Sequence, residues 1–256
     1  MRRALIGHTG FIGGTLLAAG GFTHTYNSQN FHSLAGERFD EIVCAGISAV
    51  KWLANKDPEA DWAGIQRLLD VLAQVQAGRL LLISTIDVYP DAARALDEDA
   101  ALADVPNEAY GRHRQAVEQW VIDRFPVCSI VRLPALFGEG LKKNALYDLL
   151  NDNQIEKINP ASAFQWYPTA RLSCDLARIA DAGLPIVNLF TEPVMTRDIV
   201  DRFFPGANVG SEAGPVVRYA LRTKHAALFG GAPPYVMSEN QVLTAMSDFV
   251  NRERQQ

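Results

Sequence analysis

Two groups of polar residues in the middle of the sequence have the types and spacing of an acid/base site. The first is Ser84-Thr85-Ile86-Asp87, which directly follows the apolar run 80–83. The second is Tyr110, with Arg114 four residues later. A cation one helical turn from a tyrosine favours the ionised phenol, and a threonine hydroxyl can orient a substrate carbonyl or alcohol. We therefore expect proton transfer at Tyr110.

A third group, near the N-terminus, has the spacing of a phosphate-binding turn. Gly7, Gly10 and Gly13 separate the apolar run 4–6 from a helical pattern at 15–18. Glycines let the backbone approach a pyrophosphate closely, and the N-terminus of a helix supplies oriented N–H donors. Taken alone, this G-x-x-G-x-x-G spacing also fits a turn that is merely closely packed.

Strands and helices that alternate along the chain would position these groups. The run 80–83 is apolar at every position, which is typical of a strand buried on both faces of a parallel sheet. We expect strands at 22–26, 41–46, 80–84 and 127–132, and helices at 108–125 and 144–150. A further helix is expected to begin at Asp57 and Pro58 and to end at Gly78. The segment 29–40 is too short for a full crossover helix.

This order predicts an α/β fold, a Rossmann-like doubly wound parallel sheet that binds ligands at the carboxyl ends of its strands. We expect a dinucleotide-binding domain at 1–150. The segment 151–256, where the pattern loosens, is expected to be mainly a small substrate-binding lobe, with some elements returning to the first domain. Its last helix is predicted to begin with a capping box formed by Ser238 and Gln241.

Composition narrows the class of partner. The 256 residues are 48% hydrophobic, enough for a large core, and a net charge of −5 gives no general attraction to nucleic acid or to an anionic membrane. Glycines interrupt the apolar stretch after Arg2 and Arg3, so we interpret the start as a strand and helix rather than a leader, and expect a cytoplasmic protein that binds a small molecule. The three cysteines lack metal-ligand spacing, and we expect no metal site.

Five blocks in order resemble the extended short-chain dehydrogenase/reductase family, the NAD-dependent epimerase/dehydratases. The first is the glycine turn. The second is DWAGI at 61–65 with Leu68 and Leu69, similar to N-V-x-G-T-x-x-L-L, and the third is STIDVYP at 84–90, similar to S-[ST]-x-x-V-Y-G. The fourth is YGRHRQAVE at 110–118, similar to Y-G-x-x-K-x-x-x-E, and the fifth is VRLPALFGEG at 131–140, similar to V-R-x-x-x-x-Y-G-P-G. The resemblance covers most of residues 4–140 and is weak beyond them.

The resemblance places Thr85 at the catalytic Ser/Thr position, Tyr110 at the acid/base position and Arg114 where the family has lysine. Arginine is not interchangeable with that lysine, because its planar fork cannot lose a proton in a relay. Either Arg114 is an electrostatic substitute, or the protein is a nucleotide-binding regulator or pseudoenzyme. Asp87 falls where the family's sugar-nucleotide dehydratases carry an acidic base, although an exposed turn aspartate would look the same.

The cofactor implied by the resemblance is NAD(P). Asn27 stands about twenty residues beyond the first glycine, where an Asp or Glu would bind the ribose hydroxyls of NAD. The neutral pair Asn27-Ser28 would not repel a 2′-phosphate, so we lean toward NADP. The expected cofactor-binding residues are Gly7, Thr9, Gly10, Phe11, Ile12, Gly13, Asn27, Ser28, Cys44, Ala45, Gly46, Ser84 and Pro134.

The sequence therefore predicts an NAD(P)-dependent oxidoreductase, epimerase or reductase acting on a sugar nucleotide or a similar polar carbonyl or alcohol. A sugar-nucleotide dehydratase is an alternative. A homodimer is expected if Val117, Trp120 and Val121 face outward, whereas the same residues would otherwise cover the sheet. A basic cluster at Arg218, Arg222, Lys224 and His225 is either a clamp for a substrate phosphate or a solvated surface.

Overall fold

The computed structural model describes residues 1–103 and 105–255. The chain divides into two compact units. The first consists of Met1–Pro90, Ala101–Arg132 and Ser173–Val187, and the second of Asp91–Ala100, Leu133–Leu172 and Asn188–Gln256. The acid/base residues and the glycine turn all belong to the first unit.

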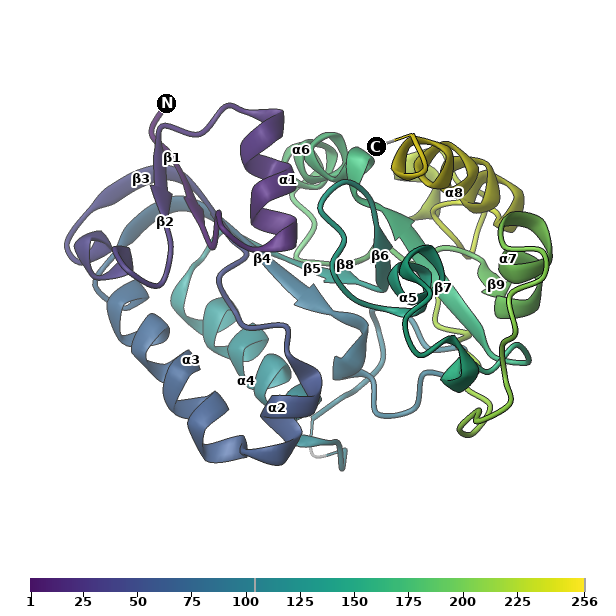
Figure 1. Ribbon diagram of the computed structural model, residues 1–256. Coiled ribbons are helices and arrows are strands. Elements are labelled where there is room, and N and C mark those ends of the chain that lie inside the picture. The colour runs from purple at the N-terminus through teal and green to yellow at the C-terminus, as the bar shows by residue number, and fades with distance from the viewer. Residues whose placement is uncertain (104, 256) are drawn as a thin grey trace. The chain divides into compact units, whose positions relative to one another are not determined.

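A six-stranded sheet in the order β2-β1-β3-β4-β5-β8 forms the centre of the first unit (Figure 1). Its strands are β1 (Arg3–Ile6), β2 (His24–Tyr26), β3 (Arg38–Cys44), β4 (Gln76–Thr85), β5 (Cys128–Leu133) and β8 (Ile186–Asn188). β1 pairs in parallel with both β2 and β3, and β3 pairs in parallel with β4. The predicted Rossmann-like α/β fold is confirmed.

Helices cover both faces of this sheet (Figure 1). They are α1 (Phe11–Ala19), α2 (Lys51–Lys56), α3 (Pro58–Leu72), α4 (Ala109–Arg124) and α6 (Leu172–Ala182). Alternate residues of β1 point to opposite faces of the sheet. Ala4 and Ile6 of β1 belong to one hydrophobic core cluster, which also contains Leu68 and Leu69 of α3 and Val117 of α4. Burial of both faces explains why the central strands are apolar throughout.

The short connection after β2 leaves β2 at the edge of the sheet. Only the 3-10 helix η1 (Phe31–Leu34) lies between β2 and β3, as expected from the length of this segment. Asp57 caps α3 by accepting a hydrogen bond from the backbone N–H of Ala60, as its place before Pro58 predicted. Gly78 does not end that helix: α3 stops at Leu72, and Gly78 lies inside β4, where an added Cβ would be 2.8 Å from the carbonyl oxygen of Asp40.

The proposed outward face of α4 is wrong for two of its three residues. Val117 and Val121 are buried at 1% and 0% exposure in the core between α4 and the sheet, and Trp120 packs partly against the same core. Val117 and Val121 therefore cover the sheet, which was the alternative, and these two side chains are not available to pair two copies of the chain.

The second unit contains a three-stranded sheet in the order β6-β7-β9. Its strands are β6 (Ala135–Phe137), β7 (Ala163–Pro168) and β9 (Pro193–Met195), and its helices are α5 (Ala145–Asn151), α7 (Thr196–Phe203) and α8 (Glu239–Glu253). Ser238 and Gln241 form the predicted capping box of α8. Buried Glu98 accepts hydrogen bonds from the backbone N–H groups of Asn188 and Lys224, which fixes the segment 91–100 to this unit.

The connection between β1 and α1 is too tightly packed for side chains. Gly7 has φ 88°, a conformation that favours glycine, and a Cβ on it would lie 2.4 Å from the carbonyl oxygen of Ala45. A Cβ on Gly13 would lie 1.9 Å from the carbonyl oxygen of Gly7. The first turn of α1 thus rests directly on the end of β1, which itself rests on the end of β3.

Replacing Gly13 with alanine should destabilise the protein, because its methyl group would overlap the backbone of Gly7. We expect the free energy of unfolding in urea to fall by roughly 3 kcal/mol or more. Gly14→Ala is the matched control: its methyl group would find its nearest neighbour, the carbonyl oxygen of His8, at 3.9 Å. Alanine favours a helix over glycine by about 1 kcal/mol, so this variant should be neutral or stabilised. Equal losses in both variants would contradict the packing described.

Candidate active site

The glycine turn presents backbone donors at the carboxyl edge of the sheet. α1 begins at Phe11 with Gly10 as its N-cap, and Gly10 uses its own N–H to bond the carbonyl oxygen of Gly7. The N–H groups in the first turn of a helix have no acceptor within the helix, so those of Phe11, Ile12 and Gly13 are the donors that an anion would use. Thr9 is exposed beside them.

The end of β2 carries no carboxylate. The Asn27 side-chain oxygen accepts a hydrogen bond from the backbone N–H of Gln29, and the Asn27 N–H donates to the side chain of Asn30. Ser28 is exposed in the same turn. Arg38, the nearest arginine in sequence, lies at the start of β3 and bonds Gln76, whereas Cys44 at the other end of the strand pairs with Ile6. Arg38 therefore lies at the N-terminal end of its strand, whereas the glycine turn lies at the C-terminal ends of the strands.

The end of β3 contributes backbone rather than side chains. Cys44 is buried, and burial raises the pKa of its thiol to about 11. A Cβ on Gly46 would lie 2.8 Å from a methyl carbon of Ile6. Of the predicted cofactor-binding residues Cys44, Ala45 and Gly46, only the last two, which follow the strand, lie in the loop at the sheet edge.

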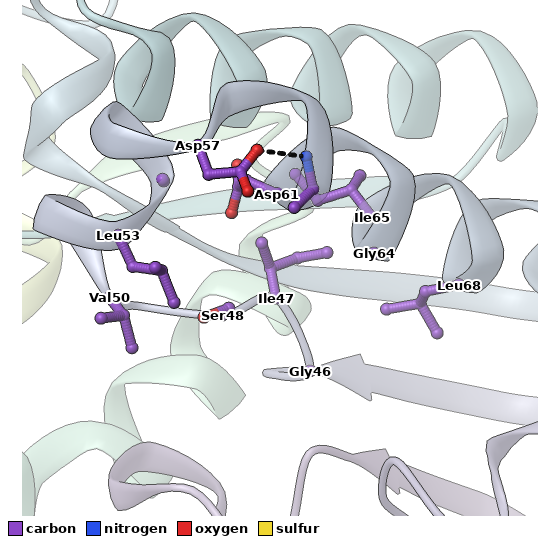
Figure 2. A pocket seen from close by; sticks show the side chains of 12 residues that line it. Gly46, Ile47, Ser48, Val50, Leu53, Asp57, Asp61, Gly64, Ile65 and Leu68 are labelled. Atoms are coloured by element: carbon purple, nitrogen blue, oxygen red, sulfur yellow. Dashed lines mark hydrogen bonds between the residues drawn. The ribbon is translucent and has the colours of Figure 1, made fainter.

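A cavity of about 290 Å³ opens beside this loop. Figure 2 shows the loop from Gly46 to Val50 facing Asp57, Asp61 and Leu68 of the α3 segment. The lining is largely apolar, with Ile47, Val50, Leu53, Ile65 and Leu68 among its members. A cavity with an apolar wall and a few polar groups is suited to a planar ring that carries hydrogen-bonding edges.

Thr85, Asp87 and Tyr110 come together at the end of β4. The Thr85 hydroxyl donates to a carboxylate oxygen of Asp87 at 2.9 Å and accepts from the Asp87 backbone N–H at 3.2 Å. α4 packs directly on this turn, since a Cβ on Gly111 would lie 2.1 Å from the carbonyl oxygen of Asp87. Tyr110, in the first turn of α4, is 6% exposed, and its backbone N–H donates to Asn55.

Arg114 is buried in a network of its own. Its guanidinium donates to both carboxylate oxygens of Asp61, at 2.6 and 3.2 Å, and to the carbonyl oxygen of Ser48. It also lies over the ring of Tyr110, 4.1 Å from the centroid. His113 shares Asp61 at 2.8 Å. Arg114 thus connects α4 to α3 and to the loop after β3, and Asp61 balances most of its charge.

The environment keeps Tyr110 protonated. Burial raises the pKa of Tyr110 above its ordinary value, the charge of Arg114 lowers it, and Asp87 raises it. A hydrogen bond with Thr85 and the charge of Lys51 lower the pKa by smaller amounts. Since the net shift is upward, the phenol holds its proton at neutral pH and is ready to act as an acid.

Ser84 is part of a buried network rather than of the open turn. Its hydroxyl donates to Glu118 at 2.5 Å, and Glu118 accepts two further hydrogen bonds from Arg132 in addition to their 2.6 Å ion pair. Arg132 also donates to the hydroxyl of Tyr89. These side chains fasten α4 to β4 and β5 behind the acid/base residues, so the Ser84 hydroxyl already has a partner.

Sequence reasoning missed three residues of this site. Lys51 places its ammonium 2.7 Å from Asp87, Asn55 holds the N-terminus of α4, and Asp61 holds Arg114. Lys51 and Asn55 lie on α2, a helix that was not predicted. Asp61 is the first residue of the DWAGI block, at a position where the similar pattern has asparagine. The negative charge of Asp61 at that position could have indicated that it pairs with an arginine.

Two remaining predictions fall in the second unit. Pro134 lies between β5 and β6, and exposed Lys224 of the basic cluster forms an ion pair with Asp99. Arg218 and Arg222 are exposed. Among the described residues, no helix is long and apolar enough to cross a membrane.

Comparison with known proteins identifies the family. The model of the NAD dependent epimerase/dehydratase family matches residues 23–159, which is more than half of the chain. The chain belongs to this family. It is thus an epimerase/dehydratase-type enzyme with an NAD(P) cofactor, in agreement with the resemblance of its motifs. A comparison with curated proteins found no match.

Solved structures share the fold across nearly the whole chain. The dehydratase DesIV from Streptomyces venezuelae, a dTDP-glucose 4,6-dehydratase solved with NAD, has a TM-score of 0.77 at 17% identity, covering 100% of this chain and 97% of its own. A dTDP-4-dehydrorhamnose reductase from Yersinia enterocolitica has a TM-score of 0.74 at 14% identity, covering 98% and 99%. RMD from Pseudomonas aeruginosa, complexed with NADPH, has a TM-score of 0.69 at 20% identity, covering 98% and 100%.

Asp61 gives a pH-dependent contribution to stability. Burial acts to raise the pKa of Asp61, but hydrogen bonds from Arg114 and His113, together with their charges, bring it below the ordinary value. A carboxyl with a lowered folded pKa stabilises the protein above its unfolded pKa of about 3.9, and this stabilisation disappears as the pH falls through the folded pKa.

Asp61→Asn should therefore lower the free energy of unfolding near neutral pH by roughly 3–5 kcal/mol, because it leaves the buried charge of Arg114 without a counter-charge. The difference from wild type should shrink as the pH falls below about 4. Urea unfolding across this range measures it. Asp70→Asn, at an exposed position of α3, is the control and should show little difference at any pH. A constant difference for Asp61→Asn would contradict the assignment.

Proposed function

We propose that the protein reduces a carbonyl group of a nucleotide sugar with NADPH, and that Tyr110 donates the proton. The observation that carries this proposal is the position of buried Tyr110 beside Thr85, at the same end of the parallel strands as the glycine turn. Reduction of a carbonyl needs a protonated acid, and a tyrosine whose pKa is at or above its ordinary value supplies one at neutral pH.

The residues present fit a dinucleotide. The N–H groups in the first turn of α1 have no acceptor within the helix and would hold the pyrophosphate, and Gly7 and Gly13 let the turn and the helix pack closely enough to present them. The cavity beside Gly46 would hold one end of the dinucleotide, because Gly46 lines the cavity and also packs against Gly7. A neutral Asn27, already engaged by Gln29, supports NADPH over NADH.

The chain's own groups would act in a fixed order. The bound cofactor supplies a hydride to the substrate carbon. Thr85 orients the carbonyl oxygen through its hydroxyl, which moves from Asp87 to the substrate, and the Tyr110 hydroxyl gives its proton to the same oxygen. Arg114 holds the ring of Tyr110 from behind, at 4.1 Å, and stabilises the phenolate left after the transfer.

The substrate class is inferred from chemistry shared by structural neighbours. Two of them are a dTDP-glucose 4,6-dehydratase and a dTDP-4-dehydrorhamnose reductase, so the same fold serves proteins named for nucleotide-sugar substrates.

A dehydratase is the second candidate, supported by the place of Asp87. Its carboxylate contacts the Thr85 hydroxyl at 2.9 Å, and its side chain is 23% exposed. It therefore lies in the acid/base cluster rather than on an outer turn. A carboxylate in this position could remove a proton from a substrate carbon.

Tyr110→Phe should abolish turnover while leaving the affinity for the cofactor nearly intact. We expect kcat to fall by about 10²–10⁴-fold, the usual contribution of a positioned acid. Binding of NADPH and NADH is measured by fluorescence, and turnover on a panel of UDP-, GDP- and dTDP-linked sugars and 4-keto sugars. NADPH is expected to bind more tightly than NADH.

The same panel distinguishes the alternatives. Elimination of water without net consumption of NADPH would favour the dehydratase, and cofactor binding without turnover would favour a regulator. Failure of both nucleotides to bind at millimolar levels would reject the proposal, and full activity in Tyr110→Phe would remove that residue from its assigned role.

A further inference from the structure

Lys51 brings an ammonium group into the acid/base cluster from an element outside the known motifs. It stands at the start of α2, and its Nζ lies 2.7 Å from one carboxylate oxygen of Asp87, while the other oxygen of Asp87 accepts from Thr85 at 2.9 Å. A second carboxylate, that of Glu108, is 3.6 Å from Lys51. The Lys51 ammonium, the Asp87 carboxylate and the Thr85 hydroxyl thus form a hydrogen-bonded series from α2 to the end of β4.

Arg114 leaves a need for such a cation. Its guanidinium is 4% exposed and is committed to Asp61 and to the carbonyl of Ser48. Those bonds fix its position, and a guanidinium cannot release a proton. In contrast, the Lys51 side chain is 49% exposed on a flexible stem, and its ammonium can reorient between partners.

We propose, on the basis of the reduction proposed above, that Lys51 is a positioning residue that supplies the mobile ammonium absent from the Tyr110–Arg114 pair. It holds the Asp87 carboxylate against the Thr85 hydroxyl, and its positive charge offsets the negative charge that develops on Tyr110 as the proton leaves. Lys51 on α2 in this way supplies the ammonium group that is missing on α4, where Arg114 stands at the position at which the resembled pattern has lysine.

The charges around Tyr110 come from four elements. Arg114 lies on α4 itself, Asp87 in the 3-10 turn η2 (Ile86–Val88), and Lys51 on α2, while Asp61 of α3 faces Arg114. Glu108, immediately before α4, faces Lys51. Removing Lys51 takes away a positive charge near Tyr110, and it also leaves the negative charge of Asp87 without its counter-charge. Both make ionisation of Tyr110 harder.

The experiment compares Lys51→Met, Lys51→Arg and Lys56→Met in the full chain without cofactor. Lys56 is the exposed lysine at the other end of α2 and serves as the matched control. The protein is labelled with ¹³Cζ-tyrosine, the Tyr110 resonance is assigned by its loss in Tyr110→Phe, and its shift is followed with pH. Lys51→Met should move the midpoint upward. Lys51→Arg and Lys56→Met should leave it near the wild-type value.

Turnover provides the second readout. With a substrate found in the panel above, Lys51→Met should lower kcat by roughly tenfold and shift the pH profile upward, with rescue by Lys51→Arg. An unchanged Tyr110 midpoint in Lys51→Met, or an equal shift in Lys51→Arg or Lys56→Met, would overturn the proposal. Because the titration needs neither cofactor nor substrate, it judges Lys51 even if the proposed reduction fails.

Discussion

The buried ion pair between Arg114 and Asp61 is the contact on which the candidate site depends. It joins α4, α3 and, through Ser48, the loop after β3, which are the elements that hold Tyr110, the cavity and the backbone beside the glycine turn. An unpaired charge at 4% exposure would be costly, so Arg114 and Asp61 must be considered together. Their pairing explains how the arginine at position 114 can be buried without an unpaired charge.

Two different cations lie near Tyr110 and Asp87. Arg114 supports the ring of Tyr110 and balances Asp61, whereas the cation nearest to Asp87 is Lys51. The net upward shift in the pKa of Tyr110 shows that burial outweighs the charge of Arg114.

Local signals made much of the first unit predictable. The glycine turn, the Asp57 cap and the capping box at Ser238 depend on neighbours a few residues apart, and each was found from sequence. The three-stranded sheet was not, because β6 and β9 have three residues each and acquire their pairing through β7. Gly78 was misread because a glycine that ends a helix and one that allows close packing within a strand look alike in sequence. Arg114 and Asp61 are 53 residues apart, and Lys51 and Asp87 are 36 apart, so these contacts follow from the fold.

A double-mutant cycle between Asp61 and Arg114 tests the central claim most directly. Free energies of unfolding near neutral pH are measured for wild type, Asp61→Asn, Arg114→Met and the double variant. If the two residues form one buried unit, each single change is strongly destabilising, the double change costs much less than their sum, and the coupling energy is about 2–3 kcal/mol. Additive losses, with a coupling energy near zero, would show that Arg114 is not held by Asp61 and would contradict this account of the site.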